Sequence, residues 1–308
     1  MELIRGLHNI RPQHHGCVLT IGKFDGIHLG HQAVLQNVLQ QADALKLPAV
    51  VMVFEPQPEE LFAPEHAPAR LSLLRDKYVG LKQIGVHRLL CVRFGAEFSS
   101  MSPQAFIKEL LVDKLGVKFL VVGDDFRFGV GRSGDFEMLK EQGSALGFNV
   151  VSTQSYRIHD NRISSTAIRD ALSNSDFSLA KEMLGHPFEV GGKVVHGEQN
   201  GRKIGFPTAN ILMKRTKSPV NGVFAVKVKH NARVYGGVAN VGYRPTLEGN
   251  KLQLEAHLFD FNGDLYSTHL RVEFVSKIRD EIKFSDFQEL SKQIEKDAAQ
   301  AKLLLANQ

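Results

Sequence analysis

The strongest constraint on the fold is a change in the pattern of the sequence near residue 185. Before this point, short apolar runs alternate with amphipathic segments, which predicts strands and helices in turn. We expect strands at residues 18–22, 49–54, 88–92, 118–122 and 149–152, and helices at residues 31–45, 71–84, 103–111, 134–146 and 164–172. Because helices join consecutive strands, the first part is predicted to be a doubly wound α/β domain around a parallel sheet.

After residue 185 the pattern becomes one of strands. Strand-like runs at residues 188–195, 222–229, 234–241, 252–259 and 269–275 are separated by glycine and asparagine turns, and a helical segment follows at residues 284–305. This predicts an antiparallel barrel or sandwich that is covered by one helix. Gly185 followed by Pro187 is typical of a helix end. We therefore expect two domains, residues 1–185 and residues 186–308, which suits the length of the chain.

Composition excludes several classes of protein. No apolar run approaches the roughly 18 residues of a membrane-spanning helix, and the N-terminus lacks the apolar stretch of a secretion signal. Cys17 and Cys91 have no disulfide or metal-ligand spacing and are expected in the core. The net charge of +5 comes from residues 186–308, where basic side chains are scattered rather than gathered in a stripe. We expect a cytoplasmic protein with no membrane or nucleic-acid partner.

The segment of residues 22–31, GKFDGIHLGH, follows the first expected strand and begins the first expected helix. Ligands bind at this edge of a parallel sheet, and a helix N-terminus with nearby glycines attracts phosphate. His28 and His31 are three residues apart, so both rings can face one phosphate and stabilise an in-line displacement. Residues predicted to contact the nucleotide are Gly22, Phe24, Asp25 and Gly30. The alternatives are a capping and a core histidine, or a zinc site that lacks a third ligand of suitable spacing.

Two later segments also follow the expected strands. Residues 123–129, GDDFRFG, come directly after a buried strand, at the same edge of the sheet. Residues 162–169, RISSTAIR, place hydroxyls at a helix start, which predicts a second polyphosphate site. Its members are Ser164, Ser165, Thr166 and Arg169. Either serine could instead be an ordinary N-cap.

A further motif, residues 201–210 or GRKIGFPTAN, lies in the second part. Pro207 favours an extended backbone, in which Thr208 and Asn210 point the same way. A hydroxyl and an amide oxygen presented together can serve a Mg²⁺ that is bound to nucleotide phosphates. The flanking residues expected near the nucleotide are Gly201, Lys203, Gly205 and Pro207. An ordinary β-turn is the alternative.

Taken together, these motifs resemble those of the bacterial bifunctional riboflavin kinase/FAD synthetases. The first part is similar to their adenylyltransferase module in G-x-F-D-G-x-H-x-G-H, in F-E-P-x-P at residues 54–58, in G-x-D-F-R-F-G and in R-x-S-S-T-x-I-R. The second part is similar to their kinase module in GRKIGFPTAN, NVGYRPT at residues 240–246, LEAHLFDF at residues 254–261 and IRDEIKF at residues 278–284. One departure is Ser267 after Tyr266, where the family more usually has glycine.

The resemblance implies a six-stranded antiparallel barrel in the second part and two reactions. The kinase module would convert riboflavin and ATP to FMN, with Thr208 and Asn210 on Mg-ATP and Glu255 activating the ribityl 5′-hydroxyl. The adenylyltransferase module would then make FAD from FMN and ATP, also with Mg²⁺. Side chains implied for flavin binding are Asp125, Phe126, Arg127, Phe128 and Arg271. The expected partners are these small molecules, and the oligomeric state is left open.

Three other functions fit parts of this pattern. One is an RNA-binding or tRNA-charging protein, although residues 162–169 contain no lysine of the kind on which the synthetase loop depends. A second is a flavin-binding module without catalysis. A third is a nucleotidyltransferase for another phosphorylated metabolite, which the second domain disfavours.

Overall fold

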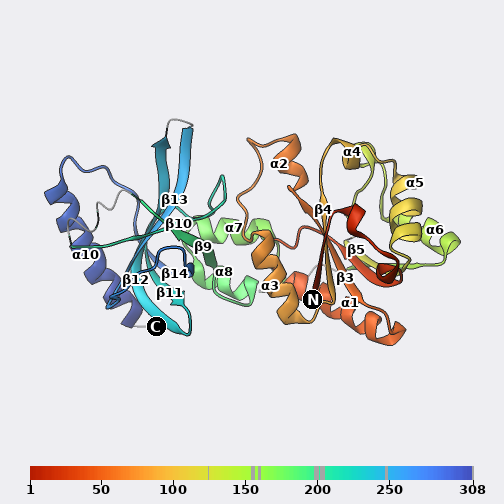
Figure 1. Cartoon of the computed structure of the whole chain (residues 1–308), viewed down its shortest axis with the longest axis horizontal. Coiled ribbons are helices and arrows are strands. Elements are labelled where there is room, and N and C mark those ends of the chain that lie inside the picture. The colour runs from red at the N-terminus through yellow and green to blue at the C-terminus, as the bar shows by residue number, and fades with distance from the viewer. Residues whose placement is uncertain are drawn as a thin grey trace. The chain divides into compact units, whose positions relative to one another are not determined.

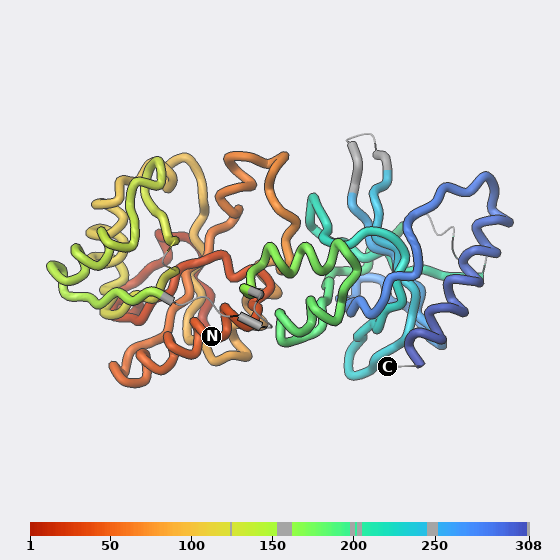
Figure 2. The backbone as a smooth tube through the Cα atoms, turned by 180° about the vertical axis from the view of Figure 1, so that it is seen from behind, coloured from red at the N-terminus to blue at the C-terminus, as the bar shows by residue number. Residues whose placement is uncertain are grey.

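The computed structural model describes residues 1–123, 125–153, 157–158, 161–197, 201, 205–246 and 249–306. Its contacts divide the chain into two compact units. One comprises Met1–Pro68 and Ser72–Ser164, and the other comprises Ala69–Leu71 and Ser165–Gln308. The two units are shown in Figure 1 and, from behind, in Figure 2, and each is described by itself.

The first unit contains a parallel sheet with the strand order β1-β4-β3-β2-β5-β6. The strands are β1 (Glu2–Arg5), β2 (Cys17–Ile21), β3 (Ala49–Glu55), β4 (Arg88–Arg93), β5 (Val117–Gly123) and β6 (Asn149–Thr153). The five expected strands are confirmed, and the short edge strand β1 is an addition. The chain winds outward from β2 through β3 to β4, and in the opposite direction from β5 to β6. The switch point therefore lies between β2 and β5, the position at which open α/β sheets bind ligands.

Helices cover both faces of this sheet (Figure 1). They are α1 (Leu29–Leu45), α2 (Pro58–Phe62), α3 (Leu74–Ile84), α4 (Ala96–Ser99), α5 (Pro103–Ala105), the π-helical η3 (Phe106–Lys114), η4 (Val130–Arg132) and α6 (Phe136–Leu146), with η1 (Leu7–Asn9) and η2 (Pro12–His14) before β2. Along β2, Leu19 packs with Leu110 and Leu139 on one face, whereas Val18 packs with Val38 on the other. The doubly wound prediction is thus confirmed. Cys17 and Cys91 are buried and form no disulfide, as expected of core residues.

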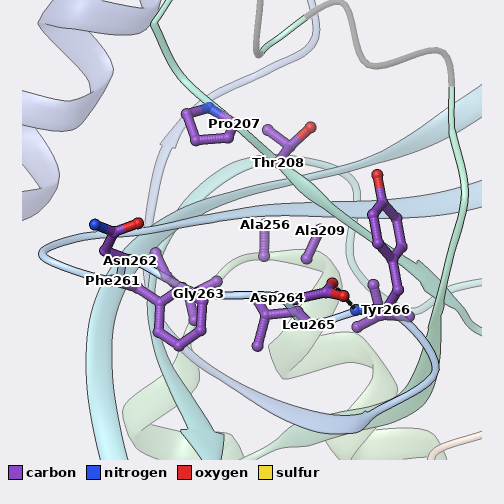
Figure 3. A pocket seen from close by; sticks show the side chains of 12 residues that line it. Pro207, Thr208, Ala209, Ala256, Phe261, Asn262, Gly263, Asp264, Leu265 and Tyr266 are labelled. Atoms are coloured by element: carbon purple, nitrogen blue, oxygen red, sulfur yellow. Dashed lines mark hydrogen bonds between the residues drawn. The ribbon is translucent and has the colours of Figure 1, made fainter.

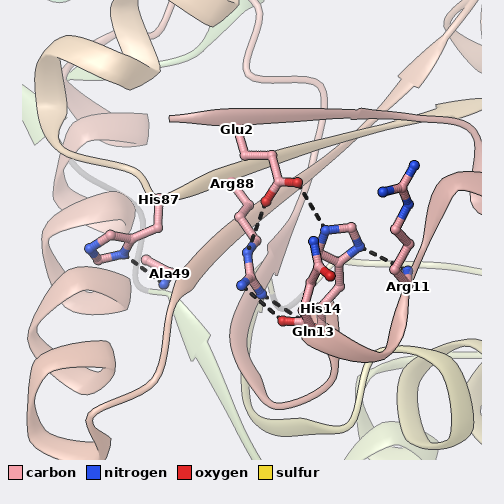
Figure 4. Close-up of polar contacts among 7 residues, drawn as sticks. All are labelled: Glu2, Arg11, Gln13, His14, Ala49, His87 and Arg88. Atoms are coloured by element: carbon pink, nitrogen blue, oxygen red, sulfur yellow. Dashed lines mark hydrogen bonds and ion pairs between the residues drawn. The ribbon is translucent and has the colours of Figure 1, made fainter.

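A polar cluster joins the edge strand β1 to the sheet (Figure 4). His14 Nδ1 accepts a hydrogen bond from the Arg11 N–H at 2.9 Å, so its Nε2 carries the proton that faces Glu2 Oε1 at 3.0 Å. The other carboxylate oxygen of Glu2 lies 3.4 Å from Arg88 Nε. Arg88 also donates to the carbonyl of Gln13 at 3.0 Å. These contacts give His14, which is buried, a structural role.

The second unit is a closed antiparallel barrel with the strand order β10-β13-β12-β11-β14-β9. Its strands are β9 (Glu189–Val195), β10 (Ala209–Leu212), β11 (Gly222–His230), β12 (Arg233–Thr246), β13 (Gly249–Leu258) and β14 (His269–Arg279). Helix α10 (Phe287–Ala306) packs along the outside of the barrel (Figures 1 and 2). The expected barrel with a C-terminal helix is confirmed. The sixth strand, β10, was not expected from the sequence, because it begins at the end of the motif of residues 201–210.

Two helices that the sequence assigned to the first domain group with the barrel by their contacts. They are α7 (Ser165–Ser173) and α8 (Phe177–Leu184). The reason is aromatic packing, because the ring of Phe177 lies 5.8 Å from that of Phe224 and 6.3 Å from that of Phe274. Whether the barrel folds without these helices, as a domain boundary at residue 185 implies, stays a prediction.

Candidate active sites

The first site begins where β2 ends, at the predicted switch point. The turn that follows is tight, with positive φ angles at Phe24, Gly26 and Ile27. Asp25 holds this turn in place: its Oδ1 accepts hydrogen bonds from the Ser72 backbone N–H at 2.8 Å and from the Ser72 hydroxyl at 3.2 Å. The Asp25 side chain has no exposed surface. The geometry therefore does not support the predicted nucleotide contact at Asp25 and makes it a structural clamp instead.

Phe24 is also a core residue, 2% exposed and packed with Val51 and Leu81. Its ring lies 4.9 Å from that of His31, which helps to hold the imidazole. Because its side chain is buried, Phe24 could meet a nucleotide only through its backbone, and the predicted nucleotide contact at Phe24 stays a prediction. Gly22 and Gly30 remain candidates for the predicted nucleotide contact. At Gly30 the space is tight, because a Cβ atom there would lie only 3.1 Å from His28 Nδ1.

The two histidines lie together at the start of α1, as their spacing predicted. Their rings stack with centroids 3.6 Å apart and an interplanar angle of 18°. His28 is the N-cap of the helix, since its Nδ1 accepts a hydrogen bond from the His31 N–H at 3.3 Å. The capping alternative for His28 is thus also true. A cap that uses Nδ1 leaves Nε2 as the ring nitrogen that can donate to a ligand.

His31 is held in its neutral form. Burial lowers its pKa well below the usual value, and the neighbouring His28 and the Lys77 ammonium lower it further. Lys77, on α3, has no exposed surface and lies 3.7 Å from the Glu55 carboxylate at the end of β3. A neutral imidazole still has one N–H that can donate to a phosphate, and the buried Lys77 ammonium places a positive charge nearby, so this corner suits a site that receives a polyanion.

This depressed pKa predicts how acid affects the first unit. The unfolded chain binds a proton at His31 near pH 6.5, whereas the folded chain does so only at lower pH. Stability should therefore fall as the pH drops below about 6.5, by up to about 1.4 kcal/mol per pH unit for this residue. Calorimetric unfolding of His31→Gln at several pH values should show a shallower acid loss than the parent. The exposed His66, replaced in the same way, is the control, and an unchanged slope in His31→Gln would contradict the account.

Phenylalanine side chains gather at the carboxyl ends of β3, β4 and β5. Phe54 contacts the rings of Phe94 and Phe98, with centroids 5.7 and 5.4 Å apart, and Phe62 of α2 stands edge-on to Phe94 at 5.7 Å. Phe62 is 66% exposed, which is unusual for a large apolar side chain. Sequence reasoning did not single out Phe62, Phe94 or Phe98. The available signal was that Phe62 follows the F-E-P-x-P segment of residues 54–58 closely and that Phe94 and Phe98 follow the next expected strand.

The four residues predicted at the end of β5 divide by burial. Phe128 is 6% exposed and belongs to the core, and its ring stacks on that of Phe126 at 5.7 Å. Phe126 is half-buried, and Asp125 and Arg127 are exposed. Phe126 and the two polar residues can thus contact a ligand, whereas the Phe128 ring packs against the Phe126 ring.

The second predicted polyphosphate segment starts beside the first. The Ile163 carbonyl oxygen lies 3.7 Å from the position of a Cβ on Gly30, and Ser164 follows it in the chain. Ser165 begins α7, and Thr166 is exposed on its first turn. Arg169 uses its Nε to donate to the Ala69 carbonyl. Arg169 therefore has a structural contact besides any ligand that its guanidinium binds.

In the barrel, the predicted kinase residues form a row across three strands. Glu255 of β13 is directly opposite Asn210 of β10 on one side and Asn240 of β12 on the other. Directly opposite residues on neighbouring strands have Cβ atoms about 5 Å apart. Asn210 is buried and its Oδ1 accepts a hydrogen bond from Gln253. Arg244 lies 2.6 Å from Glu255 Oε1, so the carboxylate is held by a cation.

Two cavities lie in the barrel unit. Thr208 lines both of them, whereas Glu255 and Asn240 line only the larger one. The smaller, of about 300 Å³, is lined by Pro207 and by the loop that ends at Tyr266 (Figure 3). Within that loop, the Tyr266 N–H donates to Asp264 Oδ1 at 2.8 Å. The larger cavity, of about 710 Å³, lies between the barrel and α10 and is lined by Gly201, Glu255 and several aromatic side chains. A ligand in either cavity could thus reach Thr208, and a ligand in the larger one could also reach Glu255.

Other predicted barrel residues have mixed outcomes. Lys203 lies outside the described residues. Gly205 is exposed with a φ of 82°, and Pro207 lines the smaller cavity. Arg271 is not among the residues that line either cavity and pairs instead with Glu189 at 3.7 Å. The geometry therefore does not support a flavin contact at Arg271; Arg279, which sequence reasoning missed, lines the larger cavity.

Ser267, the departure from the expected glycine, has a φ of 63°. Glycine adopts this left-handed conformation at little cost, which explains its use in the family. Here the serine N–H donates to the Val194 carbonyl at 3.0 Å, which holds the turn.

Comparison with known proteins agrees with the two halves of the chain. Residues 10–167 match the family model for FAD synthetase, and residues 184–305 match that for riboflavin kinase. A bifunctional riboflavin kinase/FMN adenylyltransferase from Escherichia coli strain K12 is 51% identical over 98% of this chain and 97% of its own. The chain belongs to the bifunctional riboflavin kinase/FMN adenylyltransferase family. Relatives with the same name from Haemophilus influenzae and Pseudomonas fluorescens are 49% and 47% identical, each over 98% of its own length.

A solved structure is also similar to this member of the family. It is a crystal structure described as a macrolide-efflux protein from Streptococcus pneumoniae, with a TM-score of 0.79 and 31% identity over 96% of this chain and 97% of that one. Among the helices that the present structure describes, none has the length and apolar composition needed to cross a membrane.

Proposed function

We propose that the residues gathered at these sites carry out the two reactions of the family. In the barrel, riboflavin and ATP give FMN and ADP. In the first unit, FMN and ATP give FAD and pyrophosphate. The observation that carries the kinase assignment is that two cavities share Thr208 and that Glu255 lines the larger of them. One cavity is large and partly aromatic, which suits a flavin, and the other suits a nucleotide.

In the kinase reaction, the ribityl 5′-oxygen attacks the γ-phosphorus of ATP, and ADP leaves. A primary hydroxyl is a weak nucleophile, so a positioned carboxylate that accepts its proton raises the rate. Glu255 lines the larger cavity and stands between Asn210 and Asn240 in the strand register. Arg244 donates a hydrogen bond to one of the Glu255 carboxylate oxygens at 2.6 Å and so helps to fix the carboxylate.

Mg²⁺ is proposed at Thr208 and Asn210. Both offer uncharged oxygen atoms, and Mg²⁺ often binds through few protein ligands because substrate phosphates supply the others. The donor set fits this arrangement: Asn210 Oδ1 faces Gln253, which fixes the amide while a second lone pair stays available. In the described part of the chain, no cluster of three or more histidine, cysteine, aspartate or glutamate side chains could hold a metal by itself. The ion would neutralise charge on the transferring phosphoryl group.

Replacing Thr208 by valine tests this assignment. Valine keeps the shape of threonine and removes the oxygen. The Mg²⁺ concentration for half-maximal FMN formation should rise at least ~10-fold, the scale on which weakened metal sites lose affinity. FAD formation from added FMN, measured in the same preparation, should keep its Mg²⁺ dependence. An unchanged Mg²⁺ dependence of the kinase would show that Thr208 does not bind the ion.

For FAD synthesis, His28 and His31 are proposed to donate hydrogen bonds to the α-phosphate of ATP while the FMN phosphate attacks it. Their stacked rings at the sheet's switch point support this role. Ser164, Ser165, Thr166 and Arg169 are proposed to bind the leaving pyrophosphate. The phenylalanines at the ends of β3 to β5, with Phe126, are proposed to bind the flavin ring. We propose small molecules as the partners, without nucleic acid or membrane, and the cytoplasm as the location, where two unpaired cysteines would stay reduced.

A further inference from the structure

Asn240, on β12 beside the larger cavity, has an amide whose orientation is determined by its neighbour. One end of this amide lies 2.9 Å from Glu281 Oε1. A carboxylate only accepts hydrogen bonds, so the end that faces it is the NH₂ group, Nδ2. The carbonyl oxygen, Oδ1, must therefore point the other way.

That oxygen is buried and has no hydrogen-bond partner among the residues that the structure describes. Native proteins leave few buried polar atoms unpaired, and each such atom calls for an explanation. Asn240 is also one of the residues that line the larger cavity. This oxygen has almost no exposed surface without a ligand, so a donor that arrives with the ligand would reach it as neighbouring side chains of the cavity wall shift.

The position of Asn240 in the barrel indicates which part of the ligand would reach it. Asn240 is the cross-strand partner of Glu255, whose carboxylate we propose as the base for the 5′-hydroxyl. Directly opposite side chains lie about 5 Å apart at Cβ. A group bonded to Asn240 is therefore near the reacting hydroxyl and not at the far end of the flavin ring.

Chemistry excludes the phosphates of the nucleotide as the partner of this oxygen. Oδ1 is an acceptor, and phosphate oxygens at neutral pH are also acceptors, so the two do not form a hydrogen bond. Asn240 does not line the smaller cavity, which we assign to the nucleotide. A ribityl chain, by contrast, carries hydroxyl donors on the carbon atoms next to the reacting one.

We propose that Asn240 Oδ1 accepts a hydrogen bond from a secondary ribityl hydroxyl adjacent to the 5′-position and so selects flavins that carry a hydroxylated side chain. The inference rests on the proposed function of the larger cavity and of Glu255. Sites that bond a substrate hydroxyl reject analogues that lack it, because the buried protein group is then left unpaired. Glu281 is the positioning residue, since its carboxylate orients the amide.

The test combines one protein change with one substrate change. Asn240→Ala and the parent enzyme are compared on riboflavin, 3′-deoxyriboflavin and 4′-deoxyriboflavin, by kcat/KM for phosphorylation and by Kd from flavin fluorescence. With riboflavin, Asn240→Ala should lower kcat/KM by ~10–100-fold. With one of the deoxy analogues, the parent should show a similar loss, and Asn240→Ala should add little to it. The proposal would be overturned if Asn240→Ala lowered kcat/KM equally with all three flavins, or if it did not lower kcat/KM with riboflavin.

Two controls separate this result from loss of fold and from failure of the proposed base. FAD formation from added FMN shows whether each preparation of enzyme is active. The comparison of riboflavin with its deoxy analogues on the parent enzyme needs no variant, so it cannot be affected by a variant that fails to fold. Glu281→Gln can still accept a hydrogen bond from Asn240 Nδ2 and should keep the discrimination between riboflavin and its deoxy analogues. Glu281→Ala should weaken this discrimination. The same result for both variants would count against an orienting role for Glu281. Glu255→Gln should lose turnover and keep the deoxy discrimination in Kd. If Glu255→Gln stayed active, the base assignment would fail while the binding result at Asn240 would still decide the proposal.

Discussion

Replacing Glu255 by glutamine is expected to lower the rate of FMN formation by at least ~100-fold, because the variant keeps the shape of the side chain and loses the oxygen that takes up a proton. FAD formation from added FMN should continue. Binding of Mg-ATP should change little, since Thr208 and Asn210 are unaltered. The rate of phosphorylation at saturating riboflavin and ATP is the measurement.

The barrel provides a matched control for this change. Glu273 on β14 is also a partly buried glutamate in an ion pair, with Lys229 at 3.4 Å, but it is not among the residues that line the two cavities. Glu273→Gln should therefore leave both activities close to those of the parent. Near-normal kinase turnover in Glu255→Gln would mean that the proton leaves by another route, and the base would have to be sought among other residues.

Replacing His28 or His31 by alanine is expected to reduce FAD formation by ~10²–10³-fold while riboflavin phosphorylation remains nearly intact. Loss of one preorganised donor from a site that stabilises developing charge typically has this effect. The stacked rings lie in the first unit, and the kinase residues lie in the barrel. The rate of FAD formation from FMN and ATP is the measurement.

His66, which is exposed in the same unit, serves as the control for these two variants. His28 needs one more comparison, because its side chain also caps α1. His28→Asn keeps a good N-cap residue and removes the imidazole, so it should restore stability without restoring activity. If His28→Asn recovered FAD synthesis, or if either alanine variant lost both activities equally, the histidines would support the fold and not the chemistry.

The architecture could be predicted from the sequence wherever a pattern was long enough. Buried runs such as residues 49–54 indicated the parallel sheet, and the motifs at residues 22–31 and 123–129 could be placed at its edge because each follows a strand. The short strands β1 and β10 were missed because four residues carry no clear period. The grouping of α8 with the barrel depends on Phe177 meeting Phe224 and Phe274, a contact distant in the sequence.

At the sites, motifs showed which segments matter but not what each side chain does. Asp25 lies in the middle of a phosphate-binding pattern, yet its carboxylate is used on Ser72. The row of Asn210, Glu255 and Asn240 depends on strand register, which is decided by pairing across the barrel and cannot be derived from one strand. Likewise, Arg271 and Arg279 lie far apart along β14, and only their positions in the folded barrel show that Arg279 lines the cavity whereas Arg271 pairs with Glu189.

The central claim is that one chain carries two separate reaction sites, one for each phosphorus-centred step. Chromatography of flavins after incubation with riboflavin, ATP and Mg²⁺ tests it directly, with the parent, Glu255→Gln and His28→Asn measured side by side. The account predicts that the parent forms FMN and then FAD, that Glu255→Gln leaves riboflavin unchanged but converts added FMN to FAD, and that His28→Asn accumulates FMN. Failure of folded Glu255→Gln to convert added FMN to FAD, failure of folded His28→Asn to form FMN, or normal FMN formation by Glu255→Gln would contradict it.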